Sequence, residues 1–316
     1  MNLIEAVALS KCYDEKAKKK VYAVKDVDLA IRKGETLALV GESGCGKSTF
    51  GKMLLQLEKN TSGQVFYRGE NISEYGFNKM RTIRNNMQMI FQNSANLFNP
   101  YYTVKQIIME PINNYSKDSE ADKEQRIIDI LSKVGLHSSY LTRYGNQLSG
   151  GERQRVGIAR ALVLKPEFVV CDEVVASVDY TMRNQILNLL VDLKEQFGLT
   201  YLFISHDLSA VKKICDRVVV MYMGNIMEIL PSIEENIKHP YTKALLAASL
   251  DINPRNRQKK KILFRENEEQ NIAKNGCVFQ NRCLYTNNKC KVTKPKLKNI
   301  GDKHFVACHL YNKNYI

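Results

Sequence analysis

Residues 41–48 carry the clearest chemical signal in the chain. Two glycines separated by four residues are followed by lysine and serine, directly after the short apolar run of residues 36–40. Glycines let backbone N–H groups close around phosphate oxygens, and the N-terminus of a following helix adds positive potential. The pattern therefore predicts a phosphate-binding loop in which Lys47 reaches the β- and γ-phosphates and the Ser48 hydroxyl binds Mg²⁺. The residues expected around the phosphates are Gly41, Glu42, Ser43, Gly44, Cys45, Gly46, Lys47, Ser48 and Thr49.

Two consecutive carboxylates follow another apolar run. Residues 168–171 read Phe-Val-Val-Cys, and Asp172 and Glu173 come next. At the carboxyl end of a parallel strand, both side chains face the crevice in which ligands bind. We expect Asp172 to hold Mg²⁺ through its water shell and Glu173 to orient or deprotonate a water molecule that attacks the γ-phosphate. Without the glycine-rich loop, the pair would equally fit a solvated strand end.

A second glycine-containing helix start lies at residues 148–152, which read Leu-Ser-Gly-Gly-Glu. Ser149, Gly150 and Gly151 precede a long helical pattern, so their N–H groups form another helix start suited to phosphate. Taken alone, the segment also fits a simple N-cap with tight packing.

The elements that position these residues alternate along the first 230 residues. Short β-branched runs predict strands at residues 36–40, 87–91, 168–171, 202–204 and 218–221. Apolar residues at helical spacing predict helices between them, most clearly around residues 127–134 and 186–193. This alternation predicts an α/β domain with a largely parallel sheet.

Two segments depart from the alternation. From residue 93 to about 148 there is no comparable strand run, so a mainly helical insertion is expected, extending to about residue 160. Residues 251–258 are polar and contain Pro254, which is typical of a linker.

Composition excludes several classes of protein. A hydrophobic content of 44% excludes disorder as the dominant state. No apolar run reaches the roughly 18 residues of a membrane-spanning helix, and the first residues lack the pattern of a secretory signal, so a cytoplasmic chain is expected. The net charge of +14 first suggests nucleic acid. However, residues 251–316 contain 15 Lys and Arg against 5 Asp and Glu, so the excess lies in the tail.

The 8 cysteines are also unevenly distributed. Four are scattered, and Cys277, Cys283, Cys290 and Cys308 cluster in the same tail. Because this tail is short and polar, we expect it to be stabilised by a bound metal or by disulfides. A reducing cytoplasm disfavours disulfides. The spacings are wider than the close pairs of tetrahedral Zn sites and are reasonable for an iron–sulfur cluster, so an iron–sulfur cluster, Zn and free thiols all remain open.

The order of the three motifs resembles the ATP-binding cassette (ABC) ATPases over about residues 3–230. The resemblance implies a P-loop NTPase fold with a mixed sheet and a helical subdomain. It also implies that Gln92 is the Q-loop glutamine that touches Mg²⁺, that His206 contacts the γ-phosphate, and that Tyr13 stacks on adenine. The D-loop would be residues 176–179. Val174 stands where the family usually has proline, and the Ala-Ser-Val-Asp sequence of the D-loop departs from the usual Ser-Ala-Leu-Asp.

In this family, the phosphate loop of one subunit and the Leu-Ser-Gly-Gly-Glu segment of another enclose each ATP. Only one such cassette is present here, so the resemblance implies that a second ATPase subunit, and any transport pore, come from other chains.

The C-terminal part has its own resemblance. His239, Pro240 and Tyr241, together with the cysteine tail, resemble the extension of oligopeptide and dipeptide importer ATPases. This implies an ABC domain at residues 1–236, with the helical subdomain at about 93–160, and an extension at residues 237–316 whose cysteine cluster (277–308) holds a 4Fe-4S cluster, with Zn as the alternative.

The importer resemblance also implies partners and a place in the cell. The expected partners are a paralogous ATPase subunit, two permeases and an extracytoplasmic binding protein, at the cytoplasmic face of the membrane and without nucleic acid. A nickel or metal-chelate importer and a soluble ABC ATPase acting on ribosomes or DNA are the alternatives.

Overall fold

Eight strands form the main sheet of the protein, which we describe from a computed structural model. The structure describes residues 1–13, 21–92, 98–176, 178–233, 236–248 and 275–311. In spatial order the strands are β11 (Lys298–Asn299), β12 (Phe305–Val306), β10 (Asn225–Leu230), β9 (Arg217–Tyr222), β3 (Thr36–Val40), β8 (Thr200–Ser205), β7 (Phe168–Asp172) and β6 (Met87–Ile90). The five strands from β9 to β6 are parallel, as predicted, and the three added beyond β9 are antiparallel.

A second sheet of four antiparallel strands was not predicted. It consists of β2 (Tyr22–Arg32), β1 (Asn2–Cys12), β4 (Ser62–Tyr67) and β5 (Glu70–Asn71). Parallel strands are buried on both faces and read as continuous apolar runs, whereas β1 and β2 mix buried and exposed residues. The prediction of a largely parallel sheet was therefore right for the strands that carry the site and incomplete for the whole domain.

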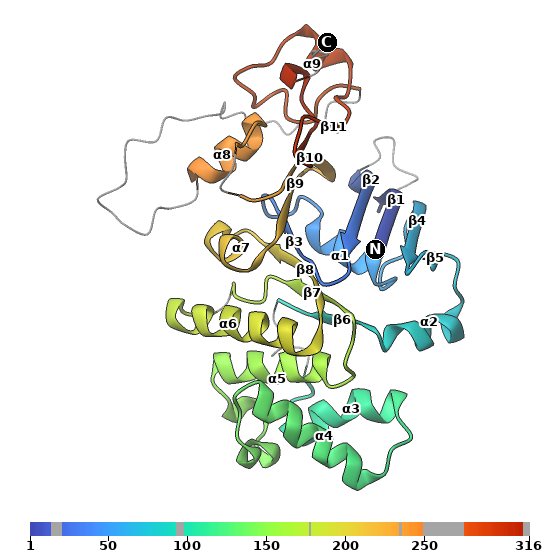
Figure 1. Ribbon diagram of the computed structural model, residues 1–316, viewed down its shortest axis with the longest axis vertical. Helices are drawn as coiled ribbons and strands as arrows, with labels where there is room; N and C mark the ends of the chain where they lie inside the picture. Colours follow the sequence, from blue (N-terminus) through green and yellow to red (C-terminus); the bar gives the residue numbers. More distant parts are fainter. Residues whose placement is uncertain (14–20, 93–97, 177, 234–235, 249–274, 312–316) are drawn as a thin grey trace.

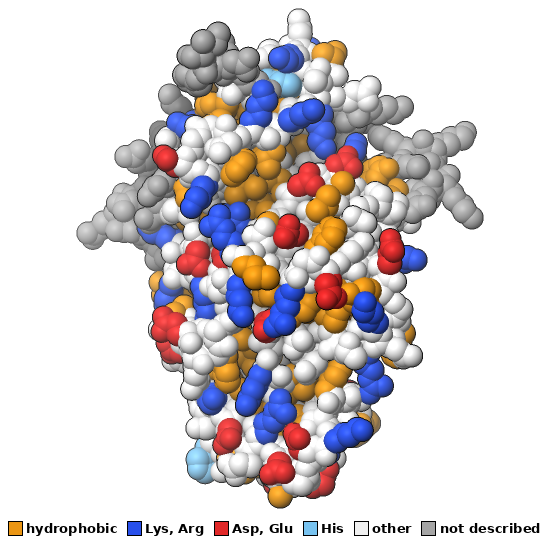
Figure 2. All heavy atoms as spheres, turned by 45° about the vertical axis from the view of Figure 1, so that its right-hand side comes forward, with side chains coloured by type: hydrophobic (Ala, Val, Ile, Leu, Met, Phe, Trp, Pro, Cys, Tyr) orange, Lys and Arg blue, Asp and Glu red, His pale blue; other side chains and the backbone are white. Residues whose placement is uncertain are grey.

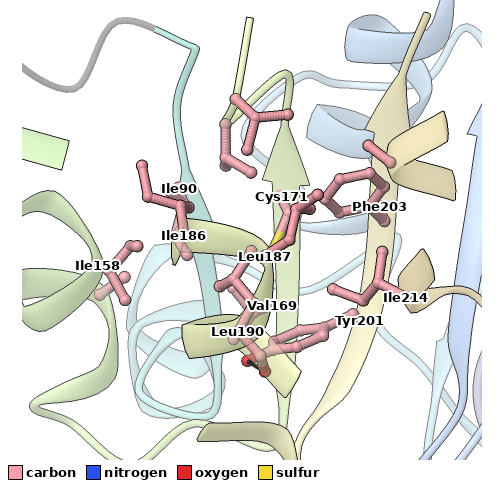
Figure 3. Close-up of a cluster of buried hydrophobic side chains, with 14 of the residues drawn as sticks. Ile90, Ile158, Val169, Cys171, Ile186, Leu187, Leu190, Tyr201, Phe203 and Ile214 are labelled. Carbon is pink, nitrogen blue, oxygen red and sulfur yellow. Dashed lines mark hydrogen bonds between the residues drawn. The ribbon is translucent and has the colours of Figure 1, made fainter. Parts of the chain in front are cut away.

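The main sheet separates two buried clusters, and successive residues of β3 enter them alternately. Ala38 and Val40 belong to the cluster on the side of the long helices, while Leu37 and Leu39 belong to the cluster beneath the second sheet. Figure 3 shows part of the first cluster, where Ile186, Leu187 and Leu190 of α6 (Tyr180–Phe197) lie against side chains of β7 and β8. The other helices of the domain are α1 (Lys47–Leu54), α2 (Phe77–Arg84) and α7 (Leu208–Ile214).

The predicted insertion is mainly helical in its described part, with connecting loops and one isolated bridge between Thr103 and Tyr144. It contains α3 (Val104–Tyr115), α4 (Glu120–Lys133), the 3-10 turns Ser138–Thr142 and Gly145–Gln147, and α5 (Gly150–Leu162). These helices form the lower end of the molecule in Figure 1. Ile127, Ile130 and Leu131 of α4 are buried, as their spacing predicted. Residues 93–97, at its predicted start, lie outside the described residues.

The C-terminal extension packs onto the main sheet. It contains α8 (Pro240–Ala248), α9 (Asn288–Val292), the two short strands β11 and β12, and the turn His309–Tyr311. β12 pairs with β10, and Cys277, Phe279, Cys283 and Cys290 belong to the same buried cluster as α6. The predicted linker of residues 251–258 lies outside the described residues.

Within the described ranges, the helices all fall short of the length and apolar character that a membrane span requires.

Candidate functional site

The predicted phosphate-binding loop connects β3 to α1, and its backbone conformation explains its glycines. Gly41, Gly44 and Gly46 have φ angles of 156°, 76° and 105°. A Cβ atom at Gly46 would collide with the backbone carbonyl of Ala23. The loop therefore requires glycine both for positive φ and for close approach of the neighbouring backbone.

The Lys47 side chain folds back over the phosphate-binding loop that precedes it. Its ammonium group donates hydrogen bonds of 2.9 Å to the carbonyl oxygens of both Gly41 and Glu42, and the residue is only 5% exposed. The positive charge is therefore held at the mouth of the loop, where the predicted phosphates would bind. Thr49 continues α1 and its hydroxyl lies 3.3 Å from that of Tyr13, whose ring is exposed. This places Tyr13 beside the loop, as a role in adenine stacking requires.

Ser48 and Asp172, two of the residues predicted to bind Mg²⁺, lie in contact with each other. The Ser48 hydroxyl donates a 2.8 Å hydrogen bond to Oδ1 of Asp172, across 124 residues of sequence. Burial raises the pKa of Asp172, although the Ser48 hydrogen bond opposes this effect. A hydroxyl and a carboxylate in contact are the hard oxygen donors that Mg²⁺ prefers, so these residues fit the expected ion.

Glu173 lies at the centre of a second group of polar side chains. Gln92 Nε2 donates a 2.6 Å hydrogen bond to Oε2 of Glu173, and His206 Nδ1 lies 3.3 Å from its other oxygen. Glu173 has a φ of 47°, an uncommon conformation for a residue with a side chain and one that recurs at functional sites. Three predicted residues from the ends of three different strands therefore meet at one carboxylate.

Together, Lys47, Ser48, Gln92, Asp172, Glu173 and His206 form what we call the strand-end cluster. Four of them lie at or just beyond the carboxyl ends of β6, β7 and β8, and Lys47 and Ser48 begin α1 after the loop that follows β3. The arrangement can bind a phosphate-bearing ligand, hold a divalent cation and activate a water molecule.

Ser149, Gly150 and Gly151 form a well-made helix start elsewhere in the molecule. The Ser149 hydroxyl accepts from the backbone N–H of Glu152, whose carboxylate accepts from the backbone N–H of Ser149. Gly151 is buried against Met182, so closely that a Cβ atom at this position would collide with the Met182 side chain. Ser149 and Gly150 are exposed. Among the described residues, no hydrogen bond joins this segment to the phosphate loop, and α5 lies with the helical insertion (Figure 1).

Burial explains one of the two places where the sequence after Glu173 differs from the usual family pattern. Val174 and Val175 are 0% and 2% exposed and belong to the main buried cluster, so apolar side chains suit these positions. Asp179 caps α6 by accepting from the backbone N–H of Met182. Ser177 of the predicted D-loop lies outside the described residues.

The four tail cysteines line one small cavity, together with His239, Phe279 and His309. Each is buried, at 8–9% exposure. Burial, with a smaller contribution from the neighbouring thiols, raises the pKa of Cys277 to about 12 and that of Cys308 to about 11. Within the part of the chain that the structure describes, no three His, Cys, Asp or Glu side chains lie in an arrangement that could hold a metal ion.

Two contacts to the phosphate loop were missed at the level of sequence. The Tyr241 hydroxyl accepts from the backbone N–H of Glu42, and Arg282 forms an ion pair with the Glu42 carboxylate. Both residues come from the extension, about 200 residues or more along the chain, and no local pattern indicates such a contact.

Known proteins share these features. Residues 24–176 match the ABC transporter family, and residues 227–290 match the oligopeptide/dipeptide transporter C-terminal region. The chain is 44% identical to the oligopeptide transport ATP-binding protein AppF of Bacillus subtilis, over 92% of this chain and 90% of that protein. It is 39% identical to the dipeptide transport ATP-binding protein DppF of Haemophilus influenzae, over 97% of this chain and 96% of that protein.

Solved structures agree with the fold. The ATP-binding cassette MJ0796, in a dimeric post-hydrolysis state bound to ADP and Pi, superposes with a TM-score of 0.64 at 27% identity, covering 71% of this chain and 96% of that one. CbiO1 of Clostridium perfringens, part of the ABC transporter complex cbiONQ, gives a TM-score of 0.66 at 26% identity, over 74% and 90% of the two chains. The fold is thus the expected P-loop NTPase cassette with a mixed sheet and a helical subdomain, and the chain belongs to the family of ABC transporter ATP-binding proteins of oligopeptide/dipeptide importers.

Proposed function

We propose that this protein is the ATP-hydrolysing subunit of an ABC importer that takes up oligopeptides or dipeptides. The observation that carries the proposal is the strand-end cluster, because it joins a phosphate loop, a pair of Mg²⁺ ligands and a positioned carboxylate at one edge of the sheet. The names of the relatives, which are transport ATP-binding proteins for oligopeptides and dipeptides, support the choice of substrate.

The residues divide the work of hydrolysis between them. Lys47 would exchange its bonds to the loop carbonyls for the β- and γ-phosphate oxygens. Ser48, Asp172 and Gln92 would hold Mg²⁺, which when bound neutralises charge on the phosphates. Glu173 would take the proton of the attacking water, and His206 would contact the γ-phosphate. The hydrogen bonds from Gln92 and His206 keep the Glu173 carboxylate oriented before ATP arrives.

The active form is proposed to be a dimer of cassettes. Ser149 and Gly150 are exposed and belong to a different part of the fold from the phosphate loop, so they are available to a second subunit. Asp172 and Glu173 would then act on an ATP that the partner's equivalent segment closes from the other side. We propose a paralogous ATPase as that partner, with two permeases and an extracytoplasmic binding protein completing the importer at the cytoplasmic face of the membrane.

Nucleic acid is not an expected partner. On the face shown in Figure 2, Lys and Arg side chains are interspersed with Asp and Glu over the body of the molecule. A nucleic-acid surface instead concentrates basic side chains in one patch or stripe.

The cysteine cavity is proposed to hold a 4Fe-4S cluster through Cys277, Cys283, Cys290 and Cys308, with Zn as the alternative. What supports this is that four thiols from a segment with little core of its own line one cavity. Among the described residues the thiols are not yet arranged as metal ligands, so binding would have to draw them together. Thiolates rather than thiols bind such groups, so binding would displace the thiol protons. A broad absorbance near 400 nm in anaerobically purified protein is expected, whereas a colourless protein containing zinc would favour the alternative.

Gentle purification of the tagged chain from membranes tests the proposed assembly. Two permeases and a second ATP-binding subunit should co-purify, and the complex should hydrolyse ATP. Recovery with ribosomes or DNA at physiological salt, and without permeases, would overturn the importer assignment.

A further inference from the structure

We propose that Arg282 and Tyr241 of the C-terminal extension are positioning residues of the nucleotide site, which they set by holding Glu42 of the phosphate loop. The inference rests on the proposed ATPase function and adds a role for the extension in it. Neither residue belongs to the ABC cassette motifs, and both reach the loop from outside the cassette.

Glu42 is held through each of its polar groups. Its backbone N–H donates a 3.0 Å hydrogen bond to the Tyr241 hydroxyl. Its carbonyl oxygen accepts 2.9 Å from Lys47, and its carboxylate oxygens both lie 2.9 Å from Nη1 of Arg282. Two of these three contacts come from the extension, so the extension restrains the residue that also holds the phosphate-binding lysine.

The two extension residues are themselves fixed by packing. The rings of Tyr222, Tyr241 and Phe279 form a cluster with centroid separations of 4.6, 5.3 and 5.4 Å. Tyr241 and Phe279 are each 1% exposed. The Arg282 guanidinium lies 5.8 Å from the centre of the Tyr222 ring and 5.9 Å from that of Phe279. The two aromatic rings therefore help to fix its position.

The main chain ties this cluster to the cysteines. Phe279 and Arg282 lie between Cys277 and Cys283, in a turn closed by hydrogen bonds from the N–H groups of Arg282 and Cys283 to the Phe279 carbonyl. On the other side, buried Glu228 of β10 accepts from the backbone N–H of His239, two residues before Tyr241. The extension therefore presents a preformed surface to the phosphate loop.

Charge gives the contact a consequence for nucleotide binding. The Glu42 carboxylate lies in the loop that is proposed to bind a triphosphate. The carboxylate and the phosphates are both negatively charged and partly shielded from water there, so they repel each other. Arg282 neutralises that carboxylate. Removing only Arg282 should therefore weaken ATP binding more than removing both members of the pair.

A double-mutant cycle on the full chain tests this inference. Equilibrium titration with a fluorescent ATP analogue should show that Arg282→Gln raises the Kd roughly five- to tenfold, since about 1 kcal/mol or more of charge-assisted contact is lost. In the Glu42→Gln background, where no loop carboxylate is left to neutralise, the added Arg282→Gln substitution should raise the Kd less than about twofold. Tyr241→Phe, which keeps the ring but loses the acceptor, should raise the Kd about threefold to fivefold.

Lys298→Gln is the matched control, because it removes one positive charge from β11 at the far edge of the sheet, where three strands separate it from β3. Arg282→Lys should recover part of the affinity, because it keeps the charge. The inference is overturned if Arg282→Gln binds ATP as Lys298→Gln does, or if the double variant binds no better than Arg282→Gln.

The same titration separates this inference from the proposed function. If the wild-type chain itself neither binds nor hydrolyses ATP, the proposed function fails. If the wild-type chain binds ATP and Arg282→Gln binds equally well, only the role of the extension fails. Should Arg282→Gln lower the melting temperature, the double variant, which lacks the same arginine, must still bind ATP more tightly than Arg282→Gln does.

Discussion

The strand-end cluster and the cysteine cavity place their functional side chains in opposite surroundings. In the cluster, Glu173 and His206 are partly or largely exposed at the ends of parallel strands, where a ligand can reach them. In the cavity, all four cysteines are buried and line one small space. The first arrangement is suited to turnover of a soluble substrate, whereas the second keeps its side chains away from solvent.

The two regions also depend differently on the rest of the molecule. The strand-end cluster is built by one sheet, and its members come from strands that pair directly with one another. The extension completes its core only by packing on that sheet, through β12, Phe279 and the buried Glu228. A change in the cluster should therefore leave the fold intact, whereas a change in the anchor of the extension should alter stability first.

Lys47→Ala should produce the largest effect and confine it to the nucleotide site. Loss of the ammonium removes its interaction with the transferred phosphate, so ATP hydrolysis should fall at least about 100-fold. Phosphate release by the purified complex measures this loss. Lys298→Gln serves as the control and should keep wild-type activity, and retention of activity in Lys47→Ala would show that the loop does not bind the phosphates.

Glu228→Ala should produce the opposite pattern. The Glu228 side chain is 0% exposed and accepts hydrogen bonds from the backbone N–H groups of Lys238 and His239, and it lies 2.8 Å from the His304 ring. Its removal leaves buried polar groups without a partner, so the free energy of unfolding should fall by about 3 kcal/mol.

Urea denaturation followed by circular dichroism measures the effect of Glu228→Ala. The exposed Glu120 on α4 provides the control, since Glu120→Ala should cost less than about 1 kcal/mol. If the two variants were equally stable, the extension would not be anchored through Glu228.

Asp207→Asn should have the smallest effect, and it should depend on pH. Burial alone would raise the pKa of Asp207, but hydrogen bonds from Ser209 and Ala210 and the charge of Arg183 outweigh it, so the pKa is lowered. A lowered carboxyl pKa adds stability that is present above the ordinary value and is lost as the pH falls through the native value.

At pH 7 the Asp207→Asn variant should therefore be about 1 kcal/mol less stable than the wild type, and the difference should shrink below about pH 4. Thermal unfolding at pH 7, 5 and 3 measures the difference. A gap that stayed constant across this range would mean that the charge of Asp207 contributes nothing.

Sequence reasoning reached the strand-end cluster because its signals are local. The glycines of residues 41–46, the two carboxylates after residue 171 and the motif order each stand in one short stretch, and strand ends of a parallel sheet meet at one edge. That Gln92, Glu173 and His206 share hydrogen bonds could be expected only from the family resemblance, because each lies after a different strand.

Local sequence patterns could not predict the second sheet, nor the contacts that the extension makes with Glu42. β1 and β2 contain register shifts and expose several residues, so their alternation is broken. The contacts of Tyr241 and Arg282 span 199 and 240 residues, and their partner is chosen by tertiary packing rather than by any pattern around them. That the four widely spaced cysteines lie together was expected, but from the family resemblance and not from their spacing.

The central claim, that ATP is hydrolysed at the strand-end cluster with Glu173 as the base, is tested most directly by the Glu173→Gln variant of the purified complex. Gln keeps the size and one acceptor but cannot take a proton, so ATP should still bind with near wild-type affinity while phosphate release falls at least about 100-fold. Hydrolysis at the wild-type rate in Glu173→Gln would contradict this account.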